Sequence, residues 1–178
     1  SRWGSIDKKL YCKRLFINWR KEPYPISLRG INWIKFLSRN NISNIEINQT
    51  LYNHYQVLLH NLEYHLLGNH LLENGFSLLF GAYYYKDESL YKAATKILKS
   101  ELNEQILTDG AHFELSPMYH QILLHRLLDC INLLQLNKWK QKGLLELLKG
   151  KAKNMLSWLE LVTFNNGNIP MVNDSTYN

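Results

Sequence analysis

Hydrophobic residues recur at spacings of three and four along most of this chain, which is the periodicity of an amphipathic α-helix. The clearest case is the segment 87–106. Its apolar face consists of Leu90, Ala94, Ile97, Leu98 and Leu102. No stretch shows the strict alternation that is typical of a half-buried strand. The pattern therefore predicts an all-α protein.

Helix start and stop signals divide this pattern into six predicted helices. Pro23 and Pro25 predict a turn, after which Ser27 caps the first helix, and Gly68 is a plausible stop for the second. The six predicted ranges are 27–38, 47–65, 69–82, 87–106, 117–136 and 140–162. The second helix is expected to present one face made of Leu51, Tyr55, Leu58, Leu59, Leu62 and Leu66.

Short polar connections join these segments into helical hairpins, as in toroids and solenoids that repeat two helices per unit. The 178 residues suffice for one domain with a real core. We therefore expect a single all-α domain over 1–178. Residues 1–43 would form an N-terminal segment with the first helix, and residues 44–178 would form the hairpins.

Composition indicates the broad class of protein. Hydrophobic residues make up 46% and charged residues 20% of the chain, which is typical of a soluble globular protein. No apolar run approaches a membrane span, and the first residues do not resemble a signal peptide. Cys12 and Cys130 are too few and too far apart for a disulfide framework or a zinc site, so free thiols are expected.

The net charge of +6 suits an acidic partner, either an anionic polysaccharide or a nucleic acid. The basic residues are scattered and no nucleic-acid-binding motif surrounds them, which argues against nucleic acid. A basic charge that serves only solubility is the alternative. The seven histidines show no metal-ligand spacing, so neither a metal site nor another cofactor is expected.

The stretch 109–120 has a candidate proton-transfer group. Asp109 and Gly110 predict a turn, Ser116 is a good N-cap, and Pro117 suits the first helical position. Tyr119 would then lie in the first helical turn, where the positive end of the helix dipole favours an anion such as a phenolate. The alternative is a half-buried aromatic side chain without a chemical role.

The stretch 65–75 has a second group of polar residues. Asn69, His70 and Glu73 cluster at a predicted helix start. An amide can donate to a carboxylate, and an imidazole can take a proton near neutral pH. The alternative is structural, with Asn69 as a helix cap and His70 as a partner of Glu73 on the same helix face.

Two long motifs in this order resemble the heparinase II/III family of polysaccharide lyases. They are NLEYHLLGNHLLEN at 61–74 and ELNEQILTDGAHFELSPMYH at 101–120. The segments PYPISLR at 23–29 and NWI at 32–34 resemble the part of the family that precedes its toroid. The resemblance covers most of residues 20–175.

The resemblance implies an N-terminal α/α toroid, of which this chain would be an incomplete part, followed by an antiparallel β-sandwich region. It also implies β-elimination on a uronic-acid-containing glycan such as a glycosaminoglycan, in a bacterial periplasm or secreted. Carried over by residue, Asn69 would neutralise the sugar carboxylate and Tyr119 would act as base or acid. His70 would abstract a proton or bind substrate. Supporting or substrate-contacting roles would fall to Glu73, His112, Glu114 and His120.

One departure from the family pattern affects the expected activity. The family uses a further histidine from the β-sandwich region, and the sequence ends at Asn178 before such a region. We therefore expect a partial chain whose own activity stays open. Its terminal helices should expose apolar faces through which it could self-associate.

Two other classes of function remain as alternatives. The first is a non-catalytic module that binds an acidic glycan or serves only as a structural helical unit. The second is a toroidal glycoside hydrolase, which needs two carboxylates flanking the scissile bond; Glu73 and Glu114 are the candidates.

Overall fold

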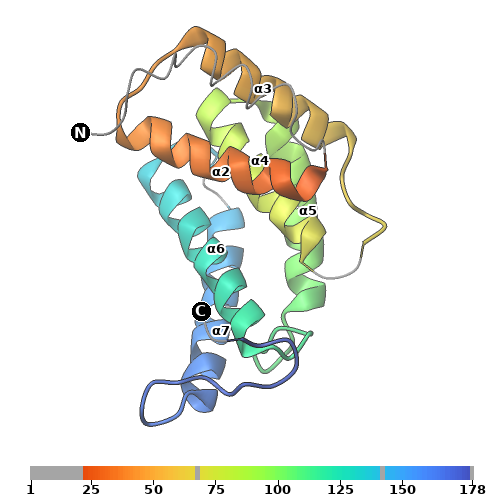
Figure 1. The fold of residues 1–178 in the computed structure, drawn as a ribbon, viewed down its shortest axis with the longest axis vertical. Helices are drawn as coiled ribbons and strands as arrows, with labels where there is room; N and C mark the ends of the chain where they lie inside the picture. The colour runs from red at the N-terminus through yellow and green to blue at the C-terminus, as the bar shows by residue number, and fades with distance from the viewer. Residues whose placement is uncertain (1–21, 67–68, 141–142, 177–178) are drawn as a thin grey trace, which may run out of the picture.

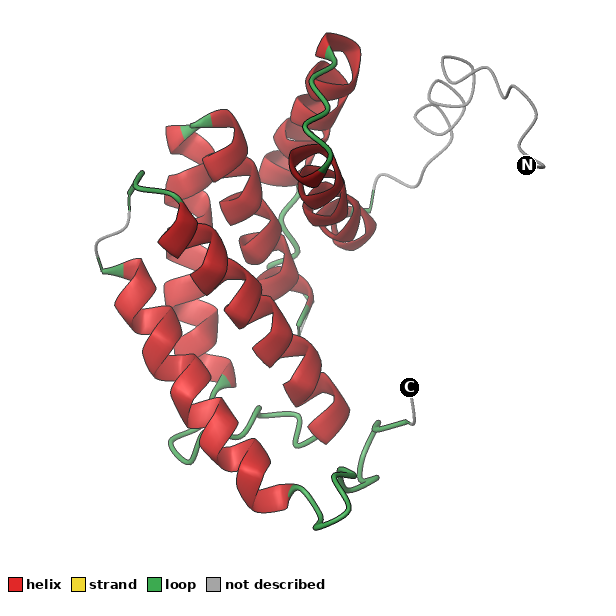
Figure 2. Ribbon diagram, turned by 90° about the vertical axis from the view of Figure 1, so that its left-hand side faces the viewer, coloured by secondary structure: helices red, strands yellow, loops and turns green. Residues whose placement is uncertain are grey.

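The computed structural model describes residues 22–66, 69–140 and 143–176 of the chain. These residues form helices joined by loops, without a strand among them (Figure 2). The helices are α2 (Pro23–Arg39), α3 (Ile45–His60), α4 (His70–Tyr85), α5 (Glu88–Gln105), α6 (Pro117–Leu136) and α7 (Leu144–Val162). The predicted all-α class of helical hairpins is confirmed. Cys12 and Gly68 lie outside the described residues.

Helix α4 lies at the centre of the fold because its side chains are buried on every side. An uninterrupted run from Leu71 to Tyr83 is buried. This helix packs most extensively against α5 and α2, and also contacts α3 and α6. A helix that is hydrophobic all round is expected in such a position. Its first turn nevertheless contains His70 and Glu73, so polar groups enter the core there.

Neighbouring helices in the sequence pack as pairs. Figure 1 shows α6 and α7 side by side, with α2 crossing near α4. The pairs α2–α3, α4–α5 and α6–α7 are all in contact, and α4 joins the first two pairs to α6. Cys130 of α6 is a free, buried thiol in this core, as the sequence predicted.

The first helix begins four residues earlier than predicted. Pro23 and Pro25 lie inside the first turn of α2 rather than in a turn before it, because proline lacks only an N–H that would be unpaired there. Ser27 is therefore not a cap. It is a buried helical residue whose carbonyl accepts a hydrogen bond from the Ser77 hydroxyl at 3.0 Å.

Helix α3 ends at His60, five residues before the predicted end. Asn61 is its C-cap, and the Asn61 side chain donates to the Val57 carbonyl at 2.7 Å. The chain then leaves the helix, and the backbone N–H of Glu63 donates to the Asn74 side chain at 3.2 Å. Leu62 and Leu66 therefore do not extend the apolar face of α3, and Leu66 is exposed.

The connection from α5 to α6 contains a tight turn at residues 107–111. Leu107 donates to the Ala111 carbonyl at 2.9 Å, and an isolated bridge pairs Ile106 with His112. Gly110 has a φ of +94°, and a Cβ there would lie 2.2 Å from the Asn154 carbonyl oxygen. Only glycine fits this position. The predicted turn at Asp109 and Gly110 is confirmed.

Helix α7 begins at Leu144, four residues after its predicted start, because Gly143 precedes it with a positive φ of 84°. Helix α6 has the predicted bounds at both ends. Among the helices of the described residues, none combines the length and the apolar composition that crossing a membrane requires.

Candidate functional site

The start of α6 places Tyr119 as the sequence predicted. The Ser116 side chain caps the helix by accepting from the Tyr119 backbone N–H at 3.4 Å, and Pro117 takes the first helical position. Ser175, from the C-terminal segment, bonds the Ser116 hydroxyl at 3.0 Å and so secures the cap. The Tyr119 side chain is half-buried in the first turn, which leaves part of it accessible to a ligand.

His112 and His120 hold this part of the fold together from inside. The His112 backbone N–H donates to the His120 Nδ1 at 3.3 Å, and the His120 Nε2 lies 2.9 Å from the Met155 carbonyl oxygen of α7. Both side chains are buried, and the pKa of each imidazole is lowered because burial disfavours the charged ring. Neither side chain is exposed to a ligand, so the structure favours a supporting role for both.

The start of α4 leaves the Asn69 side chain uncommitted to capping. Asn69 occupies the N-cap position, but its backbone is already helical and its side chain makes no capping hydrogen bond. The side chain is half-buried. The structural alternative for this residue, a conventional N-cap, is therefore wrong.

His70 has two neighbours that hold its ring. The His70 Nδ1 lies 3.3 Å from the Glu63 Oε1 of the segment after α3. On one face, the ring stacks against the Tyr24 ring of α2 with centroids 4.5 Å apart. The His70 side chain stays 40% exposed, whereas that of Glu63 is only 7% exposed. These two neighbours thus hold the imidazole ring, which remains partly open to solvent.

Glu73 is the partner of Arg126, so the structural alternative that paired His70 with Glu73 is wrong. The Arg126 Nε donates to the Glu73 Oε1 at 2.7 Å, and both side chains are largely buried. Burial raises the pKa of the Glu73 carboxyl, and the Arg126 guanidinium opposes this shift. Asp129 extends the cluster, because it contacts Arg126 and forms an ion pair with Lys35 of α2.

Tyr24, in the first turn of α2, contacts the His70 ring and is influenced electrostatically by several of these groups. Burial raises the pKa of the Tyr24 phenol, and the charges of Glu73 and Glu63, together with the neighbouring Tyr119, raise it further, while Arg126 lowers it. His70 and Tyr119 come from two motifs far apart in the sequence, yet the His70 ring packs on the Tyr24 ring and Tyr119 contributes to the pKa shift of the same phenol. The starts of α2, α4 and α6 therefore contribute to one polar cluster.

Glu114 lies in the connection before α6. Its side chain is half-buried, and burial with the nearby Asp174 raises the pKa of its carboxyl. No contact joins it to Glu73, which is committed to Arg126. The described residues contain no group of three or more His, Cys, Asp or Glu side chains placed to hold a metal ion.

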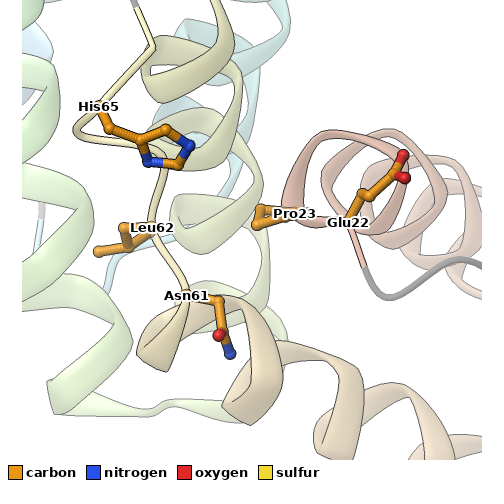
Figure 3. Close-up of a pocket in the computed structure, with 5 residues that line it drawn as sticks. All are labelled: Glu22, Pro23, Asn61, Leu62 and His65. Atoms are coloured by element: carbon orange, nitrogen blue, oxygen red, sulfur yellow. The ribbon is translucent and has the colours of Figure 1, made fainter.

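An open depression of about 530 Å³ adjoins the cluster without including its central residues. Figure 3 shows it between the segment after α3 and the start of α2. Its lining residues are Glu22, Pro23, Asn61, Leu62 and His65. Pro23 and Leu62 directly precede Tyr24 and Glu63 in the sequence, which are the two residues that contact the His70 ring.

Sequence reasoning missed three members of the cluster, namely Tyr24, Glu63 and Arg126. Tyr24 and Glu63 lie within the motifs PYPISLR and NLEYHLLGNHLLEN, which was the available signal for both. Arg126 carried no signal, because it lies in the ordinary amphipathic pattern of α6. Only packing of α6 on α4 brings it to Glu73.

Fold and cluster together define the class: an all-α protein of packed helical hairpins with a histidine, tyrosine and carboxylate cluster where three helices start. The sequence matches the model of the family described as Heparinase II/III N-terminus over residues 18–178. The chain therefore belongs to the heparinase II/III family, in its N-terminal region. No curated protein sequence matches it.

Solved structures of two proteins have the same fold. One is a heparan sulfate lyase HepC from Pedobacter heparinus, in mutant form, with 22% identity, a TM-score of 0.68 and coverage of 86% of this chain and 25% of that chain. The other is the heparinase III BT4657 gene product with methylated lysines, with 20% identity, a TM-score of 0.67 and coverage of 98% and 28%. The chain thus spans about a quarter of the length of these proteins.

Proposed function

We propose that this chain is the helical part of a polysaccharide lyase that cleaves a uronic-acid-containing glycan by β-elimination. Membership of the heparinase II/III family supports this reaction class, and the fold is shared with a heparan sulfate lyase and a heparinase III. On this proposal the hairpins are part of an α/α toroid, and the substrate is an anionic glycan that complements the basic chain.

The chemistry requires three roles. The proton on C5 of the uronate is a weak acid, so the adjacent carboxylate must be neutralised as an enediolate develops. We assign this role to the Asn69 side chain, which makes no capping hydrogen bond. Tyr119 removes the C5 proton or protonates the O4 leaving group, and His70 accepts a proton or a hydroxyl hydrogen bond from the sugar.

The observation that carries the proposal is the ring contact of His70 with Tyr24, together with the influence of Tyr119 on the pKa of the same phenol. These two motif residues are 49 positions apart in the sequence, and each is half-buried at a helix start. A glycoside hydrolase would instead need two carboxylates free to act on either side of a bond. Glu73 is bonded to Arg126, which argues against that alternative.

The Glu73–Arg126 ion pair joins two of the helices that contribute residues to the proposed site. A buried ion pair is costly to break, because one unpaired charge would remain in a low-dielectric environment. Arg126 also lowers the pKa of Tyr24 against the carboxylates that raise it. The pair links α4 to α6.

The direct test is a screen of the full-length protein against uronate polymers. Heparan-type, alginate-type and capsular polysaccharides should be compared by the ultraviolet absorbance of the double bond that β-elimination creates. Appearance of that absorbance with one polymer supports the proposal and names the substrate class. Chain shortening without the absorbance indicates hydrolysis, and tight binding without cleavage indicates a binding module; both outcomes contradict the proposal.

A further inference from the structure

The buried support beneath His70 is a chain of hydrogen bonds that runs from α2 to the proposed site. Glu63 is 5% exposed. The Glu63 Oε2 accepts from the Asn74 Nδ2 at 3.0 Å, and the same nitrogen donates to the Ser27 hydroxyl at 3.1 Å. Asn74 and Ser27 are fully buried. A buried amide in such a chain has one orientation that satisfies all its partners.

The orientation of Asn74 follows from the Glu63 backbone. A backbone N–H can only donate, and that of Glu63 lies 3.2 Å from the Asn74 side-chain oxygen. The Asn74 NH₂ group must then face the Glu63 carboxylate, which accepts from it at Oε2. The other carboxylate oxygen, Oε1, lies 3.3 Å from the His70 Nδ1.

The acceptor at Glu63 determines which nitrogen of His70 carries the hydrogen. A carboxylate accepts and does not donate, so the hydrogen of the neutral ring lies on Nδ1. Nε2 then carries the lone pair of the ring. Stacking on Tyr24, with ring planes 31° apart, fixes the plane of the imidazole. Glu73, three residues further along α4, is bonded to Arg126 and does not compete for His70.

We propose that Glu63 is a positioning residue that holds His70 in the Nδ1–H tautomer and so presents Nε2 as a proton and hydrogen-bond acceptor to the ligand. Asn74 and Ser27 orient Glu63 from the core, and Tyr24 orients the ring. The identity of the ligand as a uronate sugar rests on the proposed function. The tautomer itself does not.

The variant Glu63→Gln gives a sharp expectation because it is nearly isosteric. The Asn74 NH₂ group still requires an acceptor, so the new side-chain oxygen should face Asn74. The new NH₂ group then faces the His70 Nδ1 and donates to it. The hydrogen of the imidazole should move to Nε2, which reverses the tautomer.

The test is a long-range ¹H–¹⁵N spectrum of the histidine rings in ¹⁵N-labelled protein, at a pH where imidazole is neutral. The variant His70→Gln assigns the His70 signals by their loss. Wild-type protein should show a protonated Nδ1 and an unprotonated Nε2, and Glu63→Gln should show the reverse. The control Glu46→Gln, at an exposed position of α3, should keep the wild-type pattern.

A wild-type His70 with hydrogen on Nε2, or an even mixture of the two tautomers, overturns the inference. So does a Glu63→Gln protein that keeps the wild-type pattern. If Glu63→Gln does not fold, the wild-type spectrum alone decides, because the inference fixes its tautomer in advance.

Measurement of turnover distinguishes a failure of this inference from a failure of the proposed function. If the full-length protein is a lyase, Glu63→Gln should lower kcat by about 10²-fold or more, the size of a lost general acid–base contribution. If no uronate polymer is cleaved while the spectra behave as expected, the proposed function fails and the tautomer assignment stands. Wild-type turnover in a Glu63→Gln protein with a reversed tautomer contradicts a role for Nε2.

Discussion

Asn69 occupies a helix cap position without performing the capping that its residue type suggests. A side chain that stabilises no helix can be removed at little cost to folding. On the proposed chemistry, however, its amide stabilises charge that develops only in the transition state. The same substitution should therefore separate stability from activity.

We expect Asn69→Ala in the full-length protein to lower kcat by about 10²–10³-fold, as removal of one oxyanion donor does. KM should change little, because the lost interaction strengthens mainly in the transition state. The free energy of unfolding should stay within about 0.5 kcal/mol of the wild type. Asn53→Ala, at an exposed position of α3, is the matched control; equal rates for both variants would remove Asn69 from the mechanism.

His112 links the fold to pH. Burial, and to a lesser extent the neighbouring His120, lowers the pKa of His112 to about 4. An unfolded histidine titrates at about 6.5, so between these values the unfolded chain binds more protons than the folded chain. Above pH 6.5, His112 adds no pH dependence to the free energy of unfolding. As the pH falls from about 6.5 towards 4, stability is lost.

The free energy of urea unfolding should therefore decrease from pH 6.5 towards pH 4 in the wild type. In His112→Asn, which cannot titrate there, the decrease should be smaller, although His120 still contributes. Parallel pH profiles for the two proteins would show that His112 does not bear this dependence.

At the scale of single elements, the cap of α6 contrasts with that of α4. Ser116 is buried, its hydroxyl accepts from the Tyr119 N–H, and Ser175 bonds the same hydroxyl. Ser116→Ala should lower the free energy of unfolding by about 1 kcal/mol, the typical cost of a lost cap. Denaturant titration beside Asn69→Ala measures this. An equal, negligible loss in both variants would contradict the difference in capping.

Local signals predicted a helix bound correctly where the residues that carry the signal are neighbours in the sequence. Ser116 and Pro117 predicted the start of α6, and the prediction was confirmed. The end of α3 was mispredicted because Leu62 and Leu66 continue its apolar spacing. In the structure the helix ends earlier, and the Glu63 backbone N–H donates to the Asn74 side chain. That bond joins residues 11 apart and has no periodic signature.

At the scale of the whole molecule, α4 depends on close packing against the Tyr55 side chain of α3. A Cβ at Gly81 would lie 2.7 Å from Tyr55 ring atoms, whereas a Cβ at Gly150 of α7 would meet nothing within 4 Å. Tyr55 is fully buried, so it has no room to move aside.

Gly81→Ala should therefore lower the free energy of unfolding by about 1–3 kcal/mol, the usual cost of overpacking a core. Gly150→Ala is the matched control and should raise it by up to about 1 kcal/mol, since alanine is the better helix former. Thermal and urea unfolding of the two variants measure the difference. Stabilisation by both would show that the α3–α4 interface is looser than described.

The candidate site was predictable in part. The motif residues pointed to the starts of α4 and α6, and the all-α hairpin fold followed from periodicity. The groups that join those helix starts were not predictable, because Tyr24, Glu63 and Arg126 meet them only through packing of distant segments. The assigned roles of Asn69, His70 and Tyr119 stay predictions until turnover is measured.

The initial rate of ultraviolet absorbance increase during incubation of the full-length protein with its uronate polymer tests the central claim most directly. Tyr119→Phe removes only the phenol oxygen and should reduce this rate by about 10²–10⁴-fold, as loss of a general acid or base does. Tyr91→Phe, whose hydroxyl bonds the Lys140 carbonyl far from the cluster, should keep the wild-type rate. A Tyr119→Phe protein that forms the unsaturated product as fast as wild type would contradict the account.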